Sequence, residues 1–111
     1  MPTTPMSATR APDGVLVVTG AVDEAALDAF SEALDDASAQ WSAPTAVDVS
    51  GVTFFPSSAI SRLLAAQHAA ERGGVELTVV LPSTSIVARV LRACGLLREF
   101  TTREPGAPSG R

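Results

Sequence analysis

The segment that decides the fold reads Val47-Asp48-Val49-Ser50-Gly51-Val52-Thr53-Phe54-Phe55-Pro56-Ser57-Ser58. Its first half is rich in β-branched residues and predicts a strand over 46–50, followed by an extended stretch. A residue before proline is pushed towards extended geometry, so Phe55 belongs to the strand side of the junction. An amphipathic helix then begins near Ser57 or Ser58 and runs to about Arg72, with Ser57 as its natural N-cap. We expect the Ser57 hydroxyl to cap this helix by accepting a hydrogen bond from an amide of the first turn.

The strands predicted on either side of this segment follow the same logic. The run 15–19 is β-branched and nearly continuous, which is typical of a strand buried on both faces, and Gly20 ends it. The turn signal Pro12-Asp13-Gly14 precedes this run, so an extended 7–10 would pair with it as a hairpin. A further strand is predicted over 75–81, and 96–102 offers a short last strand.

Two more helices are predicted from apolar residues three or four positions apart. The first starts at Asp23, whose carboxylate suits the positive end of the helix dipole. The third opens at Pro82-Ser83, and Gly73-Gly74 stops the helix between them. The inward residues are Leu27, Phe30, Leu34, Ala37 and Trp41 in the first helix, and Ile86, Val87, Val90, Leu91 and Cys94 in the third.

This alternation predicts an α/β fold with a mixed sheet of four to five strands and about three helices packed against it. The chain of 111 residues has room for one domain, which we place at 7–103. The breaker-rich ends, 1–6 and 104–111, are expected to be flexible tails.

Composition excludes several classes of function. The net charge is −4 and all eight basic residues are scattered arginines, which is a poor footprint for nucleic acid. One cysteine, Cys94, and one histidine, His68, cannot form a metal site alone, so we expect no metal and no cofactor. No paired nucleophile and base or phosphate loop appears, so we expect no enzyme. No apolar run reaches the roughly 20 residues of a membrane span, and the first eleven residues lack a signal-peptide core, so we expect a cytoplasmic protein.

The central segment resembles the main motif of STAS domains, in particular the bacterial anti-sigma factor antagonists. Three other stretches agree with that family in order and spacing. Gly20-Ala21-Val22-Asp23 resembles its Gly-Glu-Leu-Asp segment. The other two are Arg72-Gly73-Gly74-Val75-Glu76-Leu77 and Val90-Leu91-Arg92-Ala93-Cys94-Gly95-Leu96. The resemblance covers 15–100 and implies a STAS-like fold.

The resemblance also implies a function. In this family the antagonist binds an anti-sigma factor, often a GHKL-type serine kinase, and so frees a sigma factor. The kinase phosphorylates a serine at the start of the second helix, which breaks the complex, and a phosphatase restores it. Ser57 matches that serine, with Ser58 as a reserve acceptor. The residues expected on the partner-binding surface are Asp23, Asp48, Pro56, Ser57, Ser58 and Ser61.

The sequence departs from the family at two positions. Pro56 stands where the family usually has an aspartate, and Ala59 replaces a glycine. The first departure keeps a second interpretation open, a STAS subunit of another assembly such as a lipid-transport ATPase complex, without a phosphorylation switch. Simpler interpretations also remain for single residues: Asp23 as a helix cap, Asp48 as an acceptor for loop amides, His68 as a surface side chain and Cys94 as an inert core thiol.

Overall fold

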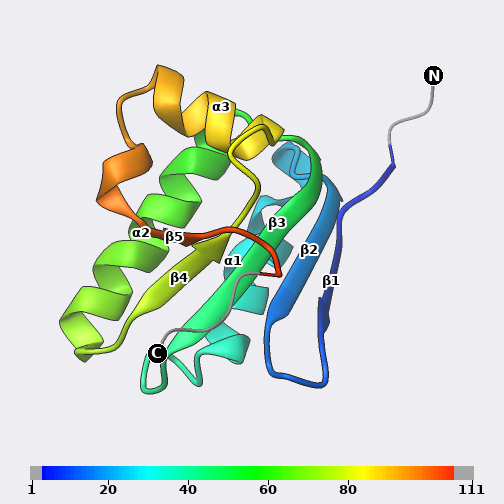
Figure 1. Cartoon of the computed structure of the whole chain (residues 1–111). Coiled ribbons are helices and arrows are strands. Elements are labelled where there is room, and N and C mark those ends of the chain that lie inside the picture. Colours follow the sequence, from blue (N-terminus) through cyan, green and yellow to red (C-terminus); the bar gives the residue numbers. More distant parts are fainter. Residues whose placement is uncertain (1–3, 107–111) are drawn as a thin grey trace.

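The computed structural model describes residues 4–106, which form a mixed five-stranded sheet in the order β1-β2-β3-β4-β5 with three α-helices (Figure 1). β1 pairs with β2 in antiparallel fashion, and the other neighbours are parallel. The predicted α/β class and element order are confirmed. The strands are β1 (Ser7–Arg10), β2 (Leu16–Ala21), β3 (Thr45–Phe54), β4 (Leu77–Val80) and β5 (Thr101–Arg103). The helices are η1 (Glu24–Ala26), α1 (Leu27–Ala37), α2 (Ser57–Gly73), α3 (Ile86–Ala93) and η2 (Leu97–Glu99). Of the tails predicted at 1–6 and 104–111, residues 1–3 and 107–111 lie outside the described residues.

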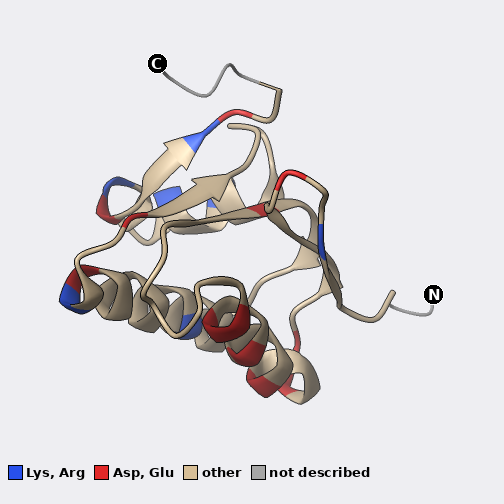
Figure 2. Ribbon diagram, turned by 90° about the horizontal axis from the view of Figure 1, so that it is seen from below, with Lys and Arg blue, Asp and Glu red and all other residues tan. Residues whose placement is uncertain are grey.

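The helices α1 and α2 lie on the same side of the sheet (Figure 2). In β2, Leu16 and Val18 are buried towards these helices, whereas Val17 and Thr19 are only half-buried on the other face. The prediction of a strand buried on both faces was therefore wrong. A run of β-branched residues indicates a strand, but it does not show whether helices cover one face of the sheet or both.

The strand β2 also continues beyond its predicted end at Gly20. Gly20 has a φ of +83°, and the backbone of Pro5 lies where a side chain at this position would be. The amide of the next residue, Ala21, donates to Thr4 O at 3.0 Å. Glycine is needed here because only a residue without Cβ fits both the positive φ and the close approach of another backbone.

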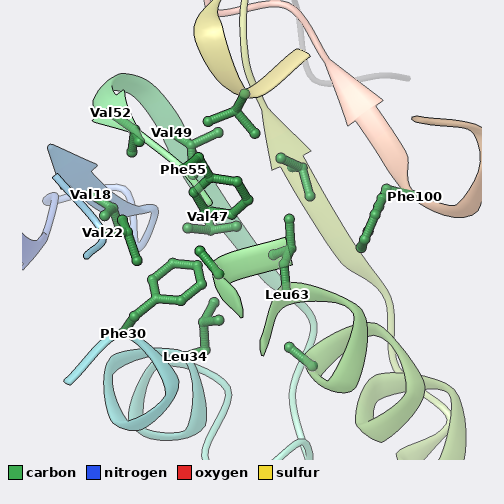
Figure 3. Packing of buried hydrophobic residues seen from close by; sticks show 14 of the residues in the cluster. Val18, Val22, Phe30, Leu34, Val47, Val49, Val52, Phe55, Leu63 and Phe100 are labelled. Carbon is green, nitrogen blue, oxygen red and sulfur yellow. The ribbon is translucent and has the colours of Figure 1, made fainter. Parts of the chain in front are cut away.

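One hydrophobic cluster joins the sheet to all three α-helices (Figure 3). At its centre the rings of Phe30 on α1 and Phe55 after β3 meet edge to face, with centroids 5.9 Å apart and planes at 87°. Burying one such ring contributes about 1.5–3 kcal/mol. Phe55 thus fixes the end of β3 against α1, and it places the following residues at the molecular surface.

The helix α3 is shorter than predicted, and of its predicted inward residues Ile86 and Cys94 are exposed. It starts at Ile86 with Ser85 as its cap, whose Oγ accepts from Ala88 N at 3.2 Å. Cys94 follows the last helical turn and is exposed, so the prediction of a core thiol was wrong. The physical reason is that Cys94 is the C-cap of the helix, and Gly95, with a φ of +72°, turns the chain away directly after it. The side chains that α3 buries are Val87, Ala88 and Leu91.

The connection from α1 to β3 has an unusual backbone. Ala39, Gln40 and Trp41 all have φ between +51° and +65°, so Trp41 follows α1 rather than continuing its apolar stripe. Its ring is nevertheless buried against the core, at 8% exposure, so the predicted inward orientation of Trp41 is confirmed. The indole Nε1 donates to Asp35 Oδ1 at 2.9 Å, and the backbone amide of Trp41 donates to the hydroxyl of the buried Ser38 at 3.0 Å. These bonds hold the left-handed turn in place.

Candidate functional site

The junction of β3 and α2 lies at the surface, at the end of the sheet where the parallel strands finish (Figure 1). Phe54 O accepts a hydrogen bond from Val22 N at 3.0 Å, which ties the segment after β2 to the end of β3. Successive side chains of a strand point to opposite faces. Accordingly Phe55 is buried at 3% exposure, whereas Phe54 is 50% exposed. The junction therefore presents an aromatic side chain beside the start of α2.

Ser57 is the first residue of α2, and its side chain is exposed. The cap position is taken by Pro56, with a ψ of 175°, and no side chain makes a capping hydrogen bond there. The prediction that the Ser57 hydroxyl caps α2 was therefore wrong, because the extended backbone ends one residue earlier. The helical ladder begins with Ile60 N donating to Pro56 O at 3.0 Å. The amides of the first turn, at 57–59, thus have no acceptor within the helix, as at any helix start.

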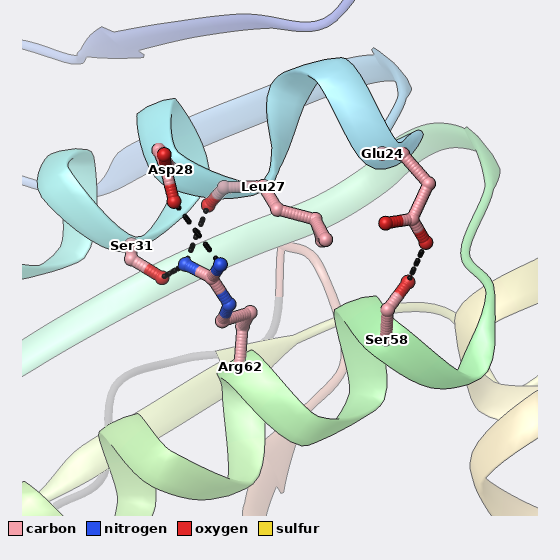
Figure 4. Close-up of polar contacts among 6 residues, drawn as sticks. All are labelled: Glu24, Leu27, Asp28, Ser31, Ser58 and Arg62. Carbon is pink, nitrogen blue, oxygen red and sulfur yellow. Dashed lines mark hydrogen bonds and ion pairs between the residues drawn. The ribbon is translucent and has the colours of Figure 1, made fainter.

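Ser58 lies in different surroundings from Ser57. Its Oγ donates to Glu24 Oε2 at 2.7 Å, a contact between residues 34 apart in sequence (Figure 4). Glu24 belongs to η1, which follows β2 and lies beside the first turn of α2. Ser58 is also half-buried, in contrast to its neighbour. Two adjacent hydroxyls therefore differ in both exposure and hydrogen bonding.

Of the two aspartates predicted on this surface, the structure brings only Asp23 close. Asp23 caps η1, with Oδ1 accepting from Ala26 N at 3.1 Å, and it directly precedes Glu24. Asp48 lies in the middle of β3, because that strand runs on for six residues to Phe54. At about 3.3 Å per residue this separates Asp48 from the junction by roughly 20 Å. Its Oδ1 accepts from Ser50 N at 2.8 Å, an amide of the same strand and not of a loop as the simpler interpretation had it.

Further along α2, two side chains follow the junction. Ser61 is exposed one turn after Ser57, on the same side of the helix. Arg62 contacts α1 instead: it forms an ion pair with Asp28 at 3.0 Å and donates to Ser31 Oγ at 2.9 Å (Figure 4). These bonds connect α2 to α1, so they fix the first turns of α2 relative to η1.

Sequence reasoning missed three residues of this region: Glu24, Phe54 and Arg62. Only Phe54 could have been predicted from the sequence, because adjacent side chains of a strand point to opposite faces and one of two neighbouring aromatic rings must therefore face away from the core. The contacts of Glu24 and Arg62 cross from one element to another over 31 to 35 positions, and no local pattern encodes them.

His68 is exposed on α2, as predicted. Within residues 4–106, no group of three or more histidine, cysteine, aspartate or glutamate side chains is placed to hold a metal ion. In the same range, no helix combines the length and the apolar character that crossing a bilayer demands. The groups that the structure gathers at the junction are hydroxyls, one exposed aromatic ring and the carboxylates of Asp23 and Glu24.

A family model described as Mlab, STAS domain, matches residues 6–101, which is most of the chain. No curated protein shows significant similarity to this sequence.

Proposed function

Because the chain belongs to the STAS domain family, we propose that it is an anti-sigma factor antagonist that works by binding another protein. The proposed partner is an anti-sigma factor of the GHKL-type serine kinase class. Phosphorylation of Ser57 by that kinase would end the complex, and a phosphatase would restore it. The observation that carries this proposal is the exposed Ser57 side chain at the first position of α2.

The surface around Ser57 supports protein docking. Phe54 is half exposed, and among residues 4–106 only Ile86 is another large hydrophobic side chain with comparable exposure. Aromatic residues, phenylalanine among them, are enriched in the cores of protein interfaces relative to the rest of the surface. Pro56, Ser57 and Ser61 add a neutral surface around that anchor. We place the partner-binding surface on these four residues, together with the neighbouring segment at 23–24.

The same surface explains how a phosphate would act. A phosphoserine brings about −1.5 to −2 charges at neutral pH. The free amides and the dipole of the first turn of α2 would accept this charge without refolding the domain. A partner that covers Phe54 and Ser57 would instead have to desolvate it, which is costly. Phosphorylation would therefore weaken binding while leaving stability nearly unchanged.

A second candidate keeps the docking surface but removes the switch. In this alternative the chain is a STAS subunit of another assembly, such as a lipid-transport ATPase complex. The observation that favours it is Pro56, which caps α2 without any side-chain acceptor where the family usually has a carboxylate. The two candidates differ in the kind of partner and in whether a charge at Ser57 matters.

Purification of the native complex, followed by affinity measurement with variants, tests both candidates. For the first candidate we expect a kinase-like anti-sigma factor, at least a tenfold loss of affinity in Ser57→Asp, and phosphate on Ser57 after incubation with ATP. The melting temperature of Ser57→Asp should stay within about 2 °C of wild type, since the group faces solvent. Ser7→Asp adds the same charge to the exposed side of β1 and serves as the control. The first candidate would be refuted in favour of the second if the purified partner is a transporter ATPase and its affinity for the chain is unchanged in Ser57→Asp.

A further inference from the structure

Two neighbouring hydroxyls at the start of α2 are chemically similar but structurally unequal. Ser57 is exposed, whereas Ser58 is half-buried and donates its proton to Glu24 Oε2 at 2.7 Å. Both lie in the first turn of the same helix, so the helix dipole acts on both in the same way. The difference between them is therefore the carboxylate that η1 places against Ser58.

We propose that Glu24 is the residue that determines which serine is modified: it blocks Ser58 and leaves Ser57 as the phosphate acceptor. This inference rests on the proposed function, because it concerns the regulation of the same site. A phosphoryl group arriving at Ser58 would come next to a carboxylate of the same sign. Its arrival would also remove the proton that Ser58 now donates to Glu24, so an attractive contact would become a repulsive one.

The transfer itself has a simple balance. A bond forms between Ser57 Oγ and the γ-phosphorus of ATP, while the bond from that phosphorus to the bridging oxygen of ADP breaks. ADP leaves with the electron pair of that bond, and the hydroxyl proton passes to a base of the kinase. Glu24 takes no part in this chemistry. It acts through Ser58 alone, by making the second hydroxyl the poorer acceptor.

A measurement without any kinase tests this role first. Phosphoserine is incorporated biosynthetically at 57 or at 58 in the full chain, with Glu24 or with Glu24→Gln, and thermal unfolding is followed. We expect phosphoserine at 58 to lower the melting temperature by about 4 °C or more, because the repulsion by Glu24 replaces a hydrogen bond and small domains respond to such a loss of stability with shifts of this size. Glu24→Gln should recover at least half of this loss. Phosphoserine at 57 should shift the melting temperature by less than about 2 °C in either background.

The matched control is Glu32→Gln, which removes an equal charge from the exposed surface of α1. It should leave the loss caused by phosphoserine at 58 unchanged. Equal losses for the two phosphoserines would overturn the proposal, and so would a loss at 58 that Glu24→Gln does not reduce. If phosphoserine at 58 prevents folding with Glu24 present, recovery of a folded chain in Glu24→Gln gives the same support, and failure to recover it overturns the proposal.

A second experiment examines the selection itself. The kinase identified as the partner is incubated with ATP and the chain, and the phosphorylated residues are mapped by mass spectrometry. We expect phosphate on Ser57 in the wild type, and a share on Ser58 that rises at least fivefold in Glu24→Gln but not in Glu32→Gln. Phosphate mainly on Ser58 in the wild type would overturn the selection. A kinase that modifies neither serine would refute the proposed switch, whereas the thermal measurement would still decide whether Glu24 and a phosphate at 58 repel each other.

Discussion

Replacing Gly73 with alanine sets two opposite effects against each other. Gly73 is the last residue of α2, and in a helix alanine is intrinsically better than glycine by about 1 kcal/mol. However, a Cβ built on Gly73 would fall on the carbonyl oxygen of Trp41, far closer than real Cβ atoms come to other atoms. That oxygen belongs to the left-handed turn over 39–41, which two hydrogen bonds of Trp41 hold in place. The oxygen cannot rotate aside as the end of a flexible side chain would.

We therefore expect the steric effect to win. Overpacking that forces a backbone shift costs typically 1–3 kcal/mol. Because the overlap here is with a backbone oxygen, we expect about 2–3 kcal/mol, of which the gain in helix propensity offsets about 1 kcal/mol. The net loss should be about 1–2 kcal/mol, which corresponds to a fall in melting temperature of about 5–10 °C. The turn that moves is the one that carries Trp41, so the environment of its indole should change as well.

Intrinsic fluorescence during urea unfolding measures both effects, because Trp41 is the single tryptophan and the chain contains no tyrosine. Gly74→Ala is the control: Gly74 has a φ of +71° and open space around the missing Cβ. It should lower stability through backbone strain alone and leave the native emission maximum unchanged. In Gly73→Ala we expect that maximum to shift to longer wavelength. Unchanged stability together with an unchanged maximum would refute the reasoning.

Three further changes test other contacts of the site. Arg62→Met keeps the apolar stem but removes the ion pair with Asp28 and the hydrogen bond to Ser31. Chemical denaturation should show that the free energy of unfolding falls by about 1 kcal/mol or less, since exposed ion pairs contribute little. Asp23→Ala removes the cap of η1 and should cost about 1 kcal/mol in the same assay, whereas an unchanged value would show that the cap is dispensable. Phe54→Ser should shift the melting temperature by less than about 3 °C but weaken partner binding at least tenfold by calorimetry; unchanged affinity would remove Phe54 from the interface.

The element order followed from local patterns. The β-branched runs, the apolar residues three or four apart and the glycines after α2 and α3 each restrict the backbone within a few residues. The predicted alternation of strands and helices was therefore confirmed, including the end of α2 at Gly73-Gly74. In α3 the same reasoning succeeded only in the middle of the helix, where Val87 and Leu91 are buried as predicted. Ile86 in the first turn and Cys94 at the C-cap are exposed, because the ends of this short helix reach beyond the core.

The amino-acid sequence determined that a serine would stand at the start of α2, because Pro56 ends the extended backbone and an amphipathic run follows it. Only the tertiary structure decided which groups surround that serine. The pairing of β2 with β3 brings the segment after Val22 alongside the end of β3, and so sets Glu24 against Ser58. The physical reason is that hydrogen bonds between strands fix the register over long stretches of chain, whereas propensity and periodicity act only between near neighbours.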